Sequence, residues 1–448
     1  MASAGTRADR QAAGAAKRLE APPSNLASWQ PAPDRPDPVT LLEEQAATRL
    51  PALVPIRHGR MSAGPFPFLR GAALPMAADL STVPVTGLTV QLCGDAHLCN
   101  FGLYASPERD LVFDVNDFDE THVGPWEWDL LRLSASLVVA ARSRGFDAHE
   151  GRHAVRAAIR SYRDRMREFA AMRAIDVYYA KVDAESILSF VHHKARPYLE
   201  ATIKSAGHHD ALHELPKITT GEGEARRIVD RPPIITHPAE ATLAVLVPPF
   251  ERYRETVQED RRVLLDRYRL VDAALKVVGV GSVGLGAWAG LLLGADDADP
   301  LFLQVKEAEA SVLERFTGGQ VPGHHGQRVV LGQRRLQAAS DVLLGWTTGV
   351  LGRHLYVRQL QDQKGSPVVE AMSPGDLAEW GVLCAWALAR GHARTGDPAV
   401  LAGYLGVDDA VPQAMTAFAV TYADQSERDH AAMLAAIASG RIAAEAGV

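Results

Sequence analysis

Residues 91–102, QLCGDAHLCNFG, constrain the fold and the chemistry of this chain more than any other stretch. An apolar run that predicts a buried strand stops there at Asp95, His97 and Asn100. Such side chains bind metals or transfer protons, so we expect the strand to end at a functional site. The alternative is that Asp95 and Asn100 only form a turn and that His97 is a structural histidine.

A second polar cluster, NDFDE, follows the next predicted strand. It offers Asp117 and Asp119 as oxygen ligands for Mg²⁺, with Asp119 alternatively a solvated neighbour. Asp129 comes twelve residues after Asp117, early in a predicted helix, where a carboxylate suits the positive helix end and can brace a loop. Phosphoryl transfer needs a carboxylate at the acceptor hydroxyl, and an amide oxygen with a second carboxylate at the metal.

A glycine-rich loop, VVGVGSVG, comes much later in the chain and contains Gly279, Gly281, Ser282 and Gly284. Glycine lets backbone amides approach phosphate oxygens closely, both in dinucleotide-binding folds and in the hairpin of a kinase small lobe. The segment after the loop is broken by further glycines, which makes it a poor crossover helix. The next strand ends in Lys306, as a phosphate-binding lysine would. We therefore expect the hairpin, with the dinucleotide site as the alternative.

The partner of Lys306 is less clearly indicated. Kinase-like sites pair this lysine with a glutamate on the next helix. Glu314 follows soon after Lys306 and is the expected partner, but the helix just before residue 341 carries glutamines and no glutamate.

A basic group precedes the first polar cluster. Arg57, Arg60 and Arg70 lie in a segment rich in Gly, Pro and Phe, which favours an anion site over plain surface charge.

The composition of the 448 residues excludes some classes of function. A formal charge of −7 argues against nucleic acid as a partner, and the three cysteines show no ligand spacing, which is typical of reduced thiols in the cytoplasm. No apolar run approaches the roughly 20 residues of a membrane helix, so we expect no membrane partner. Nothing in the sequence indicates the oligomeric state.

The two polar clusters together, GDAHLCN and NDFDETHVGPWEWDL, resemble the catalytic signature of the aminoglycoside and choline phosphotransferase branch of the protein-kinase-like superfamily. The resemblance implies that Asp95 is the catalytic base and that Asn100 and Asp117 bind Mg²⁺. It also implies that Asp129 is a structural brace and that His97 holds the loop. The cofactors implied are ATP and Mg²⁺.

The chain after residue 50 also resembles a bacterial family known as domain of unknown function 2252, which brings no activity with it. The shared phrases include RHGRM, FLRGAA, GDAHLCNFG, GPWEWDL, KVVGVGSVG, LQVKEA and YADQSERDH.

The order of these motifs is reversed relative to ordinary kinase-like chains, in which the glycine loop and lysine come first. We therefore expect an α+β, bilobal, protein-kinase-like fold with a small β-rich nucleotide lobe and a large helical lobe, in circularly permuted order. The expected segments are a mobile arm (1–38), the large lobe with a helical insert (39–270), the small lobe (271–362) and a helical return to the large lobe (363–448).

The expected function is Mg²⁺-ATP-dependent phosphotransfer to a hydroxyl of a small molecule in the cytoplasm. The alternatives are transfer of AMP, a non-catalytic nucleotide-binding pseudokinase, a dinucleotide-binding protein and a metallophosphoesterase. The last would need further histidine motifs that the sequence lacks. The leading hypothesis requires Lys306 to lie within roughly 15 Å of Asp117 across one cavity, a gap that lobe closure could bridge.

Overall fold

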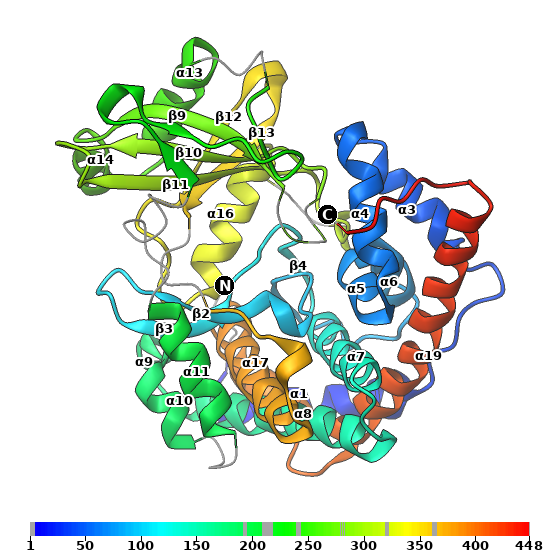
Figure 1. Cartoon of the computed structure of the whole chain (residues 1–448). Helices are drawn as coiled ribbons and strands as arrows, with labels where there is room; N and C mark the ends of the chain where they lie inside the picture. Colours follow the sequence, from blue (N-terminus) through cyan, green and yellow to red (C-terminus); the bar gives the residue numbers. More distant parts are fainter. Residues whose placement is uncertain are drawn as a thin grey trace.

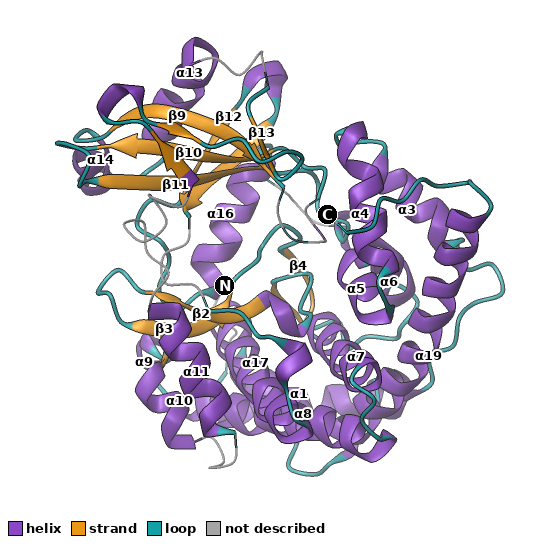
Figure 2. Cartoon of the chain, viewed as in Figure 1, coloured by secondary structure: helices purple, strands orange, loops and turns teal. Residues whose placement is uncertain are grey.

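The computed structural model describes residues 5–190, 195–207, 218–238, 243–277, 279, 281, 283–318, 322–360 and 365–447. The chain has an α+β fold in which one larger antiparallel sheet lies at one end and helices build most of the remainder (Figures 1 and 2). Among the described residues, no helix combines the length and the apolar character that crossing a bilayer requires.

The larger sheet has six strands in the order β12-β13-β11-β10-β9-β8, and every neighbouring pair is antiparallel. Apolar side chains alternate between its two faces, as the two-residue period of a strand requires. Leu291 and Leu293 of β10 pack on one face and Leu292 on the other. The strands are β8 (Ile235–Thr236), β9 (Arg269–Lys276), β10 (Ala287–Leu293), β11 (Pro300–Glu307), β12 (Gly345–Thr348) and β13 (His354–Gln359).

Two helices that lie between β8 and β9 in the chain, α13 (Leu243–Arg254) and α14 (Glu259–Leu265), belong to the same unit. Tyr253 and Leu265 are fully buried against the sheet face that carries Leu292. The expected start of the β-rich part at residue 271 is therefore wrong. Residues 235–238 and 243–270, assigned from the sequence to the large helical part, belong with the sheet, because β8 and the apolar faces of α13 and α14 bury side chains there. The short strands β6 (Thr219–Thr220) and β7 (Arg227–Ile228) precede them.

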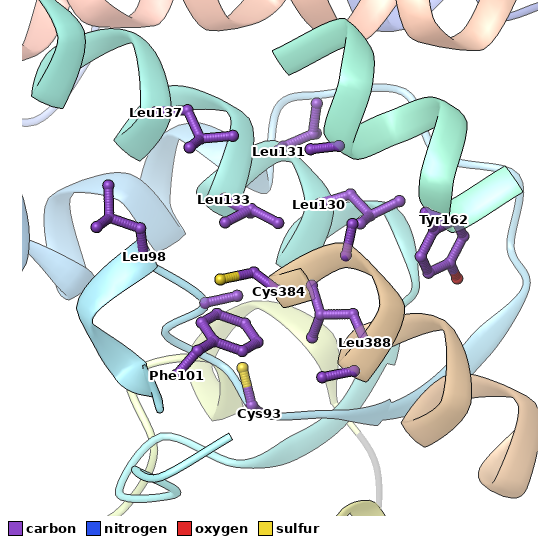
Figure 3. Close-up of a cluster of buried hydrophobic side chains, with 14 of the residues drawn as sticks. Cys93, Leu98, Phe101, Leu130, Leu131, Leu133, Leu137, Tyr162, Cys384 and Leu388 are labelled. Atoms are coloured by element: carbon purple, nitrogen blue, oxygen red, sulfur yellow. The ribbon is translucent and has the colours of Figure 1, made fainter. Parts of the chain in front are cut away.

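The helical body is built around α7 (Glu127–Ser143), α8 (Ala148–Ala171), α17 (Pro374–Thr395) and α19 (Ala410–Ala438), which pack on one another. Leu130, Leu133 and Leu137 recur at helical spacing on α7 and converge with Cys384 and Leu388 of α17 (Figure 3). The remaining helices are α3 (Pro38–Ala46), α4 (Val54–Ser62), α5 (Pro65–Gly71), α6 (Ala73–Leu80), α9 (Ala174–Tyr179), α10 (Ala184–Phe190), α11 (Arg196–Gly207), α15 (Glu314–Thr317), α16 (His325–Leu336) and α18 (Pro398–Leu405).

The N-terminal segment is not the mobile arm expected for residues 1–38. Residues 7–20 form α1 (Arg7–Glu20), which begins with a capping box, and α2 (Ser24–Ala27) follows. A Cβ at Gly14 would lie 2.0 Å from the carbonyl oxygen of Val400, so the small residue permits close packing of α1 against α18. The mobile arm was expected from a composition rich in Ala, Arg, Pro and Ser, but the small residues of α1 allow this helix contact instead.

Two small sheets set the position of the polar loops. Strand β1 (Thr89–Leu92) pairs with β4 (His122–Pro125), placing Leu92 opposite His122. Strand β2 (Phe101–Ala105) pairs with β3 (Leu111–Val115), placing Phe101 opposite Val115, and β5 (Val182–Asp183) extends that sheet. Because β1 pairs with β4 and β2 pairs with β3, the loop 93–100 lies opposite the loop 116–121.

Candidate functional site

A cavity of about 270 Å³ lies where the six-stranded sheet meets the two polar loops and helices α4 and α5. Many of the residues predicted from the sequence line it, namely Arg57, Arg70, Asp95, His97, Asn100, Asp117, Asp119, Gly279, Gly281 and Lys306. The cavity thus joins segments nearly two hundred residues apart. We refer to Asp95, Asp117 and Asp119 as its acidic wall, and to Arg49, Arg57 and Arg70 as its arginine wall.

The loop after β1 is held by Asp129, near the start of α7. The backbone amides of Cys93 and Gly94 donate to the Asp129 carboxylate at 2.8 and 3.0 Å, and Nε2 of His392 lies 3.3 Å from its Oδ2. Gly94 has φ +90°, and a Cβ there would lie 2.0 Å from the carbonyl oxygen of Glu120. Asp129 therefore occupies the bracing position expected from the sequence, although it does not line the cavity. Cys93, Leu98 and Phe101 anchor the same loop in the helical core (Figure 3).

Asp95, in the same loop, has a side chain only 14 % exposed and forms an ion pair that the sequence did not reveal. Nε of Arg132 donates to Asp95 Oδ1 at 2.7 Å, while His97 Nε2 lies 3.8 Å from Oδ2. Burial raises the pKa of Asp95 above its ordinary value, and Arg132 opposes that shift. Arg132 follows Asp129 by three positions and so lies on the same face of α7.

His97 and Asn100 organise the loop through the backbone. The Asn100 side chain donates Nδ2 to the Asp95 carbonyl at 2.7 Å, and its backbone amide donates to His97 at 2.8 Å. This orientation leaves the Asn100 amide oxygen as an acceptor. The pKa of His97 is well below its usual value, because the ring is buried and lies near Arg70 and Arg132. A neutral His97 fits a loop-holding role.

Lys306, on β11 of the six-stranded sheet, contacts the acidic loop 116–121. Nζ of Lys306 lies 2.5 Å from Asp119 Oδ2 and 3.9 Å from Asp117 Oδ2, far inside the expected separation of roughly 15 Å. Burial alone would raise the pKa of Asp119, but Lys306 and a hydrogen bond from Tyr356 at 2.7 Å lower it to about 2. Although burial opposes it, the two carboxylates raise the pKa of Lys306, so this ion pair is charged.

Helix α16 clamps the same loop with an arginine. Arg328 donates to the carbonyl oxygens of Thr121 at 2.6 Å and of Asp119 and Glu309 at 2.8 Å. It also lies 3.4 Å from Glu314 Oε1, which accepts the backbone amide of Ser311 at 3.0 Å. Glu314 is therefore not the partner of Lys306 that we expected. It faces Arg328, because it is the first residue of the short α15 and its side chain accepts the amide of Ser311, just before that helix.

The glycine loop connects β9 and β10, which pair antiparallel. The expected hairpin is confirmed, since no crossover helix follows the loop, as a dinucleotide-binding unit would require. Gly284 has φ +92° and lies outside the cavity lining, where its carbonyl accepts the backbone amide of Leu50 at 2.8 Å. A Cβ on Gly281 would lie 3.5 Å from the Arg70 carbonyl oxygen, so the loop reaches the helical body. Ser282 lies outside the described residues.

In the part of the chain that the structure describes, the arginine wall forms no ion pair with a carboxylate. Arg57 on α4 is 0 % exposed and donates Nη2 to the Gly71 carbonyl at 2.7 Å and to Gln45 at 3.1 Å. Within the described residues, its Nε and Nη1 have no hydrogen-bond partner. Nε of Arg49 and Nε of Arg70 are likewise buried without a described hydrogen-bond partner. Arg60, the third arginine predicted for this group, does not line the cavity.

Glu120 lines the cavity together with both walls and was not assigned a role from the sequence. Burial raises its pKa to about 7, although the backbone amide of Val312 donates to it at 2.7 Å. Arg358 was missed as well; it lines the cavity and binds Gln304 and the Asn116 carbonyl, each within 3 Å. The position of Glu120 directly after NDFD was the one signal for it in the sequence.

The oxygen donors of the cavity suit Mg²⁺ only together with ligand phosphates. Among the described residues, no three His, Cys, Asp or Glu side chains form a metal-binding group. Mg²⁺ is ordinarily held by one or two protein oxygens with substrate phosphates and water completing the octahedron. Asp117, whose side chain is 31 % exposed, and the amide oxygen of Asn100 fit that need once phosphates are present.

Comparison with known proteins adds one relationship. No curated protein and no solved structure matches this chain. The model of a family described as an uncharacterized protein conserved in bacteria, DUF2252, matches residues 49–436, which include both polar loops, the glycine loop and Lys306. The chain belongs to the DUF2252 family.

Proposed function

We propose that this chain is an Mg²⁺-ATP-dependent phosphotransferase that acts on a hydroxyl of a small molecule. The observation that carries the proposal is the 3.9 Å distance between Lys306 Nζ and Asp117 Oδ2, in a cavity also lined by Asp95 and Gly281. Phosphoryl transfer is catalysed mainly by positioning and charge neutralisation, and these groups are the ones it needs.

Each group has a role in the proposed reaction. The acceptor oxygen attacks the γ-phosphorus, the bond to the β–γ bridging oxygen breaks, and ADP leaves while Asp95 takes the hydroxyl proton. Arg132 holds Asp95 Oδ1, so Oδ2 is the atom available to the acceptor. Burial raises the pKa of Asp95, which makes it a stronger base than an exposed aspartate.

The phosphates of ATP would lie between Lys306 and the glycine loop. Gly279 and Gly281 line the cavity, and their lack of Cβ lets backbone amides approach phosphate oxygens. Lys306 would exchange part of its contact with Asp119 for the phosphates. Mg²⁺ held by Asn100 and Asp117 would neutralise charge on the phosphates.

The fold assignment belongs to the same proposal: a bilobal, protein-kinase-like arrangement in circularly permuted order. Helix α17 ends where β1 begins, since Thr395 Oγ1 accepts the Gln91 amide at 3.2 Å and a Cβ on Gly396 would contact Val90. In an unpermuted chain α17 would lead directly into β1 and the Asp95 loop. This adjacency supports the permutation, which domains tolerate when the joined ends lie close together.

The test uses ATP labelled separately on the γ- and α-phosphorus, with the small-molecule fraction of a bacterial extract as the source of acceptor. We expect Mg²⁺-dependent transfer of the γ label only. Asp95→Asn should slow transfer by about 10²–10⁴-fold, as expected for loss of a general base. Asp34→Asn, at an exposed carboxylate, is the matched control and should behave as the wild type.

Two results would contradict the proposal. Transfer of the α label would indicate AMP transfer, which requires the opposite orientation of the nucleotide. Binding of ATP without labelling of any acceptor would indicate a non-catalytic nucleotide-binding protein.

A further inference from the structure

Buried arginines elsewhere in the molecule show how this fold ordinarily treats such charge. Arg390 pairs with Asp114 at 2.6 Å, and Arg132 pairs with Asp95 at 2.7 Å. Arg57 is buried at least as completely as either, at 0 % exposure. Yet no described carboxylate lies within ion-pair distance of it. An uncompensated buried charge is costly, so its retention calls for an explanation.

The other members of the arginine wall sharpen this contrast. Arg49 donates to the carbonyl oxygen of Val283 in the glycine loop, and like Arg57 it has no carboxylate partner within the described ranges. Arg70 also lacks one in that part of the chain. Burial and the neighbouring Arg49 hold the pKa of Arg57 well below its usual range, while Glu120 opposes the shift. Glu120, whose own pKa is about 7, acts on both Arg49 and Arg57, and Glu309 and Asp119 also act on Arg49. None of these carboxylates forms an ion pair with the arginine wall within the described residues.

The place of this wall in the cavity distinguishes it from the proposed triphosphate site. Lys306, Asp117 and Asp119 lie on the side of the sheet and of loop 116–121. The three arginines come instead from the turn after α3 and from α4 and α5, in the helical body that also positions Asp95. Arg70 lies near enough to Asp95 and His97 to influence the pKa of both. Val283 and Gly281 of the glycine loop contact the wall at Arg49 and at the Arg70 carbonyl, so the wall lies against the loop on the side of the helical body.

A neighbouring cavity of about 530 Å³ provides space for the rest of a ligand. It shares Gln45, Arg49 and Glu120 with the first cavity. A molecule seated on the arginine wall could therefore extend past Arg49.

We propose that the arginine wall, Arg49, Arg57 and Arg70, binds a phosphate group carried by the acceptor, so that the substrate of this site is a phosphorylated small molecule with a free hydroxyl. This inference rests on the proposed phosphotransferase function. Guanidinium groups from three directions suit a tetrahedral dianion with several acceptor oxygens. A single carboxylate would leave most of the positive charge uncompensated.

The test measures binding of inorganic phosphate by calorimetry, in phosphate-free buffer, with the wild type saturated with Mg²⁺ and a non-hydrolysable ATP analogue. We expect phosphate to bind alongside the analogue. Arg57→Met should weaken phosphate binding by about tenfold or more, because a charge-assisted hydrogen bond is lost, and leave analogue binding unchanged. Arg60→Met on the same helix is the matched control and should bind phosphate as the wild type does.

Arg70→Met provides a second variant in case Arg57→Met folds poorly, and it should weaken phosphate binding in the same direction. Acetate in place of phosphate should bind weakly. Equal binding of acetate would overturn the assignment to a phosphate group.

The remaining outcomes separate this inference from the proposed function. Competition between phosphate and the ATP analogue would assign the arginines to the nucleotide and overturn the inference. Binding of the analogue with no phosphate binding would overturn it while leaving the proposed function intact. Arg57-dependent phosphate binding without any analogue binding would overturn the proposed function, and with it the assignment to an acceptor.

Discussion

The two walls of the cavity handle charge in opposite ways. On the acidic wall, Asp95 is paired with Arg132 and Asp119 with Lys306, both within 2.7 Å. On the arginine wall, Arg57 is fully buried with no described carboxylate in reach. The acidic wall is therefore organised before any ligand binds, whereas the arginine wall, by our proposal, is completed by an anion. Arg132 and Arg57 are both buried, but only Arg132 has a described carboxylate partner. Replacing each in turn therefore measures how much the difference in pairing changes the free energy of unfolding.

The largest expected effect is that of Arg132→Met. Removing Arg132 leaves Asp95 buried without its counter-ion, so the free energy of unfolding should fall by about 3–5 kcal/mol at pH 8. Loss of Arg132 would raise the folded-state pKa of Asp95 further, so the deficit should shrink toward pH 5, where Asp95 takes up a proton. Urea denaturation at the two pH values measures both quantities. A deficit under about 1 kcal/mol, the value typical of an exposed pair, would contradict the account.

The next effect is a pH dependence of the free energy of unfolding that arises in part from Glu120, which lines the cavity. Burial raises the folded-state pKa of Glu120, and of Glu127 at the start of α7, to about 7 from an ordinary 4.5. The folded state then binds more protons than the unfolded state between these values. The free energy of unfolding should therefore fall as pH rises through this window, by up to about 3 kcal/mol for each group.

Denaturation of Glu120→Gln and Glu127→Gln across pH 5–8.5 checks this prediction. Each variant should lose part of the slope, and the double variant most of it. An unchanged slope in the double variant would show that other groups produce it.

A smaller effect is expected for Asp129→Asn in the brace behind the acidic wall. Asparagine keeps one acceptor oxygen for the amides of Cys93 and Gly94, but turns an NH₂ group toward the other amide. The free energy of unfolding should fall by about 1–3 kcal/mol. Asp34→Asn is again the exposed control. A loss equal to that of the control would mean that the loop does not depend on Asp129.

The smallest effect is expected for Arg57→Met, and its sign is what matters. Replacing an unpaired buried cation by an apolar side chain of similar length should leave the free energy of unfolding unchanged or raise it by about 1 kcal/mol, despite the lost bond to Gly71. A loss as large as that of Arg132→Met would mean that both walls are structural and would remove the contrast between them.

The sequence predicted the parts of the site whose pattern is local. The hairpin was predicted because glycines make a poor helix after the loop, and Lys306 because it stands at the end of the next strand. Asp129 was predicted to brace a loop because it stands in the first turn of a helix. These inferences need only neighbouring residues.

Other features depend on how distant elements are oriented. Arg132 and Arg328 lie on helices where an arginine ordinarily indicates a solvated face, and only packing shows that they are buried. Glu314 was paired wrongly because the direction in which α15 presents it is set by contacts with Ser311 and Arg328. The start of the sheet unit was missed because β8 has two residues, too few for a periodic pattern, and α1 because its composition resembles a flexible tail.

The account stands most directly on whether Lys306, Asn100 and Asp117 bind one metal-bound triphosphate. Calorimetric titration of ATP with and without Mg²⁺ into the wild type and Asp117→Asn measures this. We predict binding that requires Mg²⁺ and that weakens by about tenfold or more in Asp117→Asn, because a charged ligand oxygen is lost. ATP binding of equal strength without Mg²⁺ or in the variant, or binding of NAD in its place, would contradict the account.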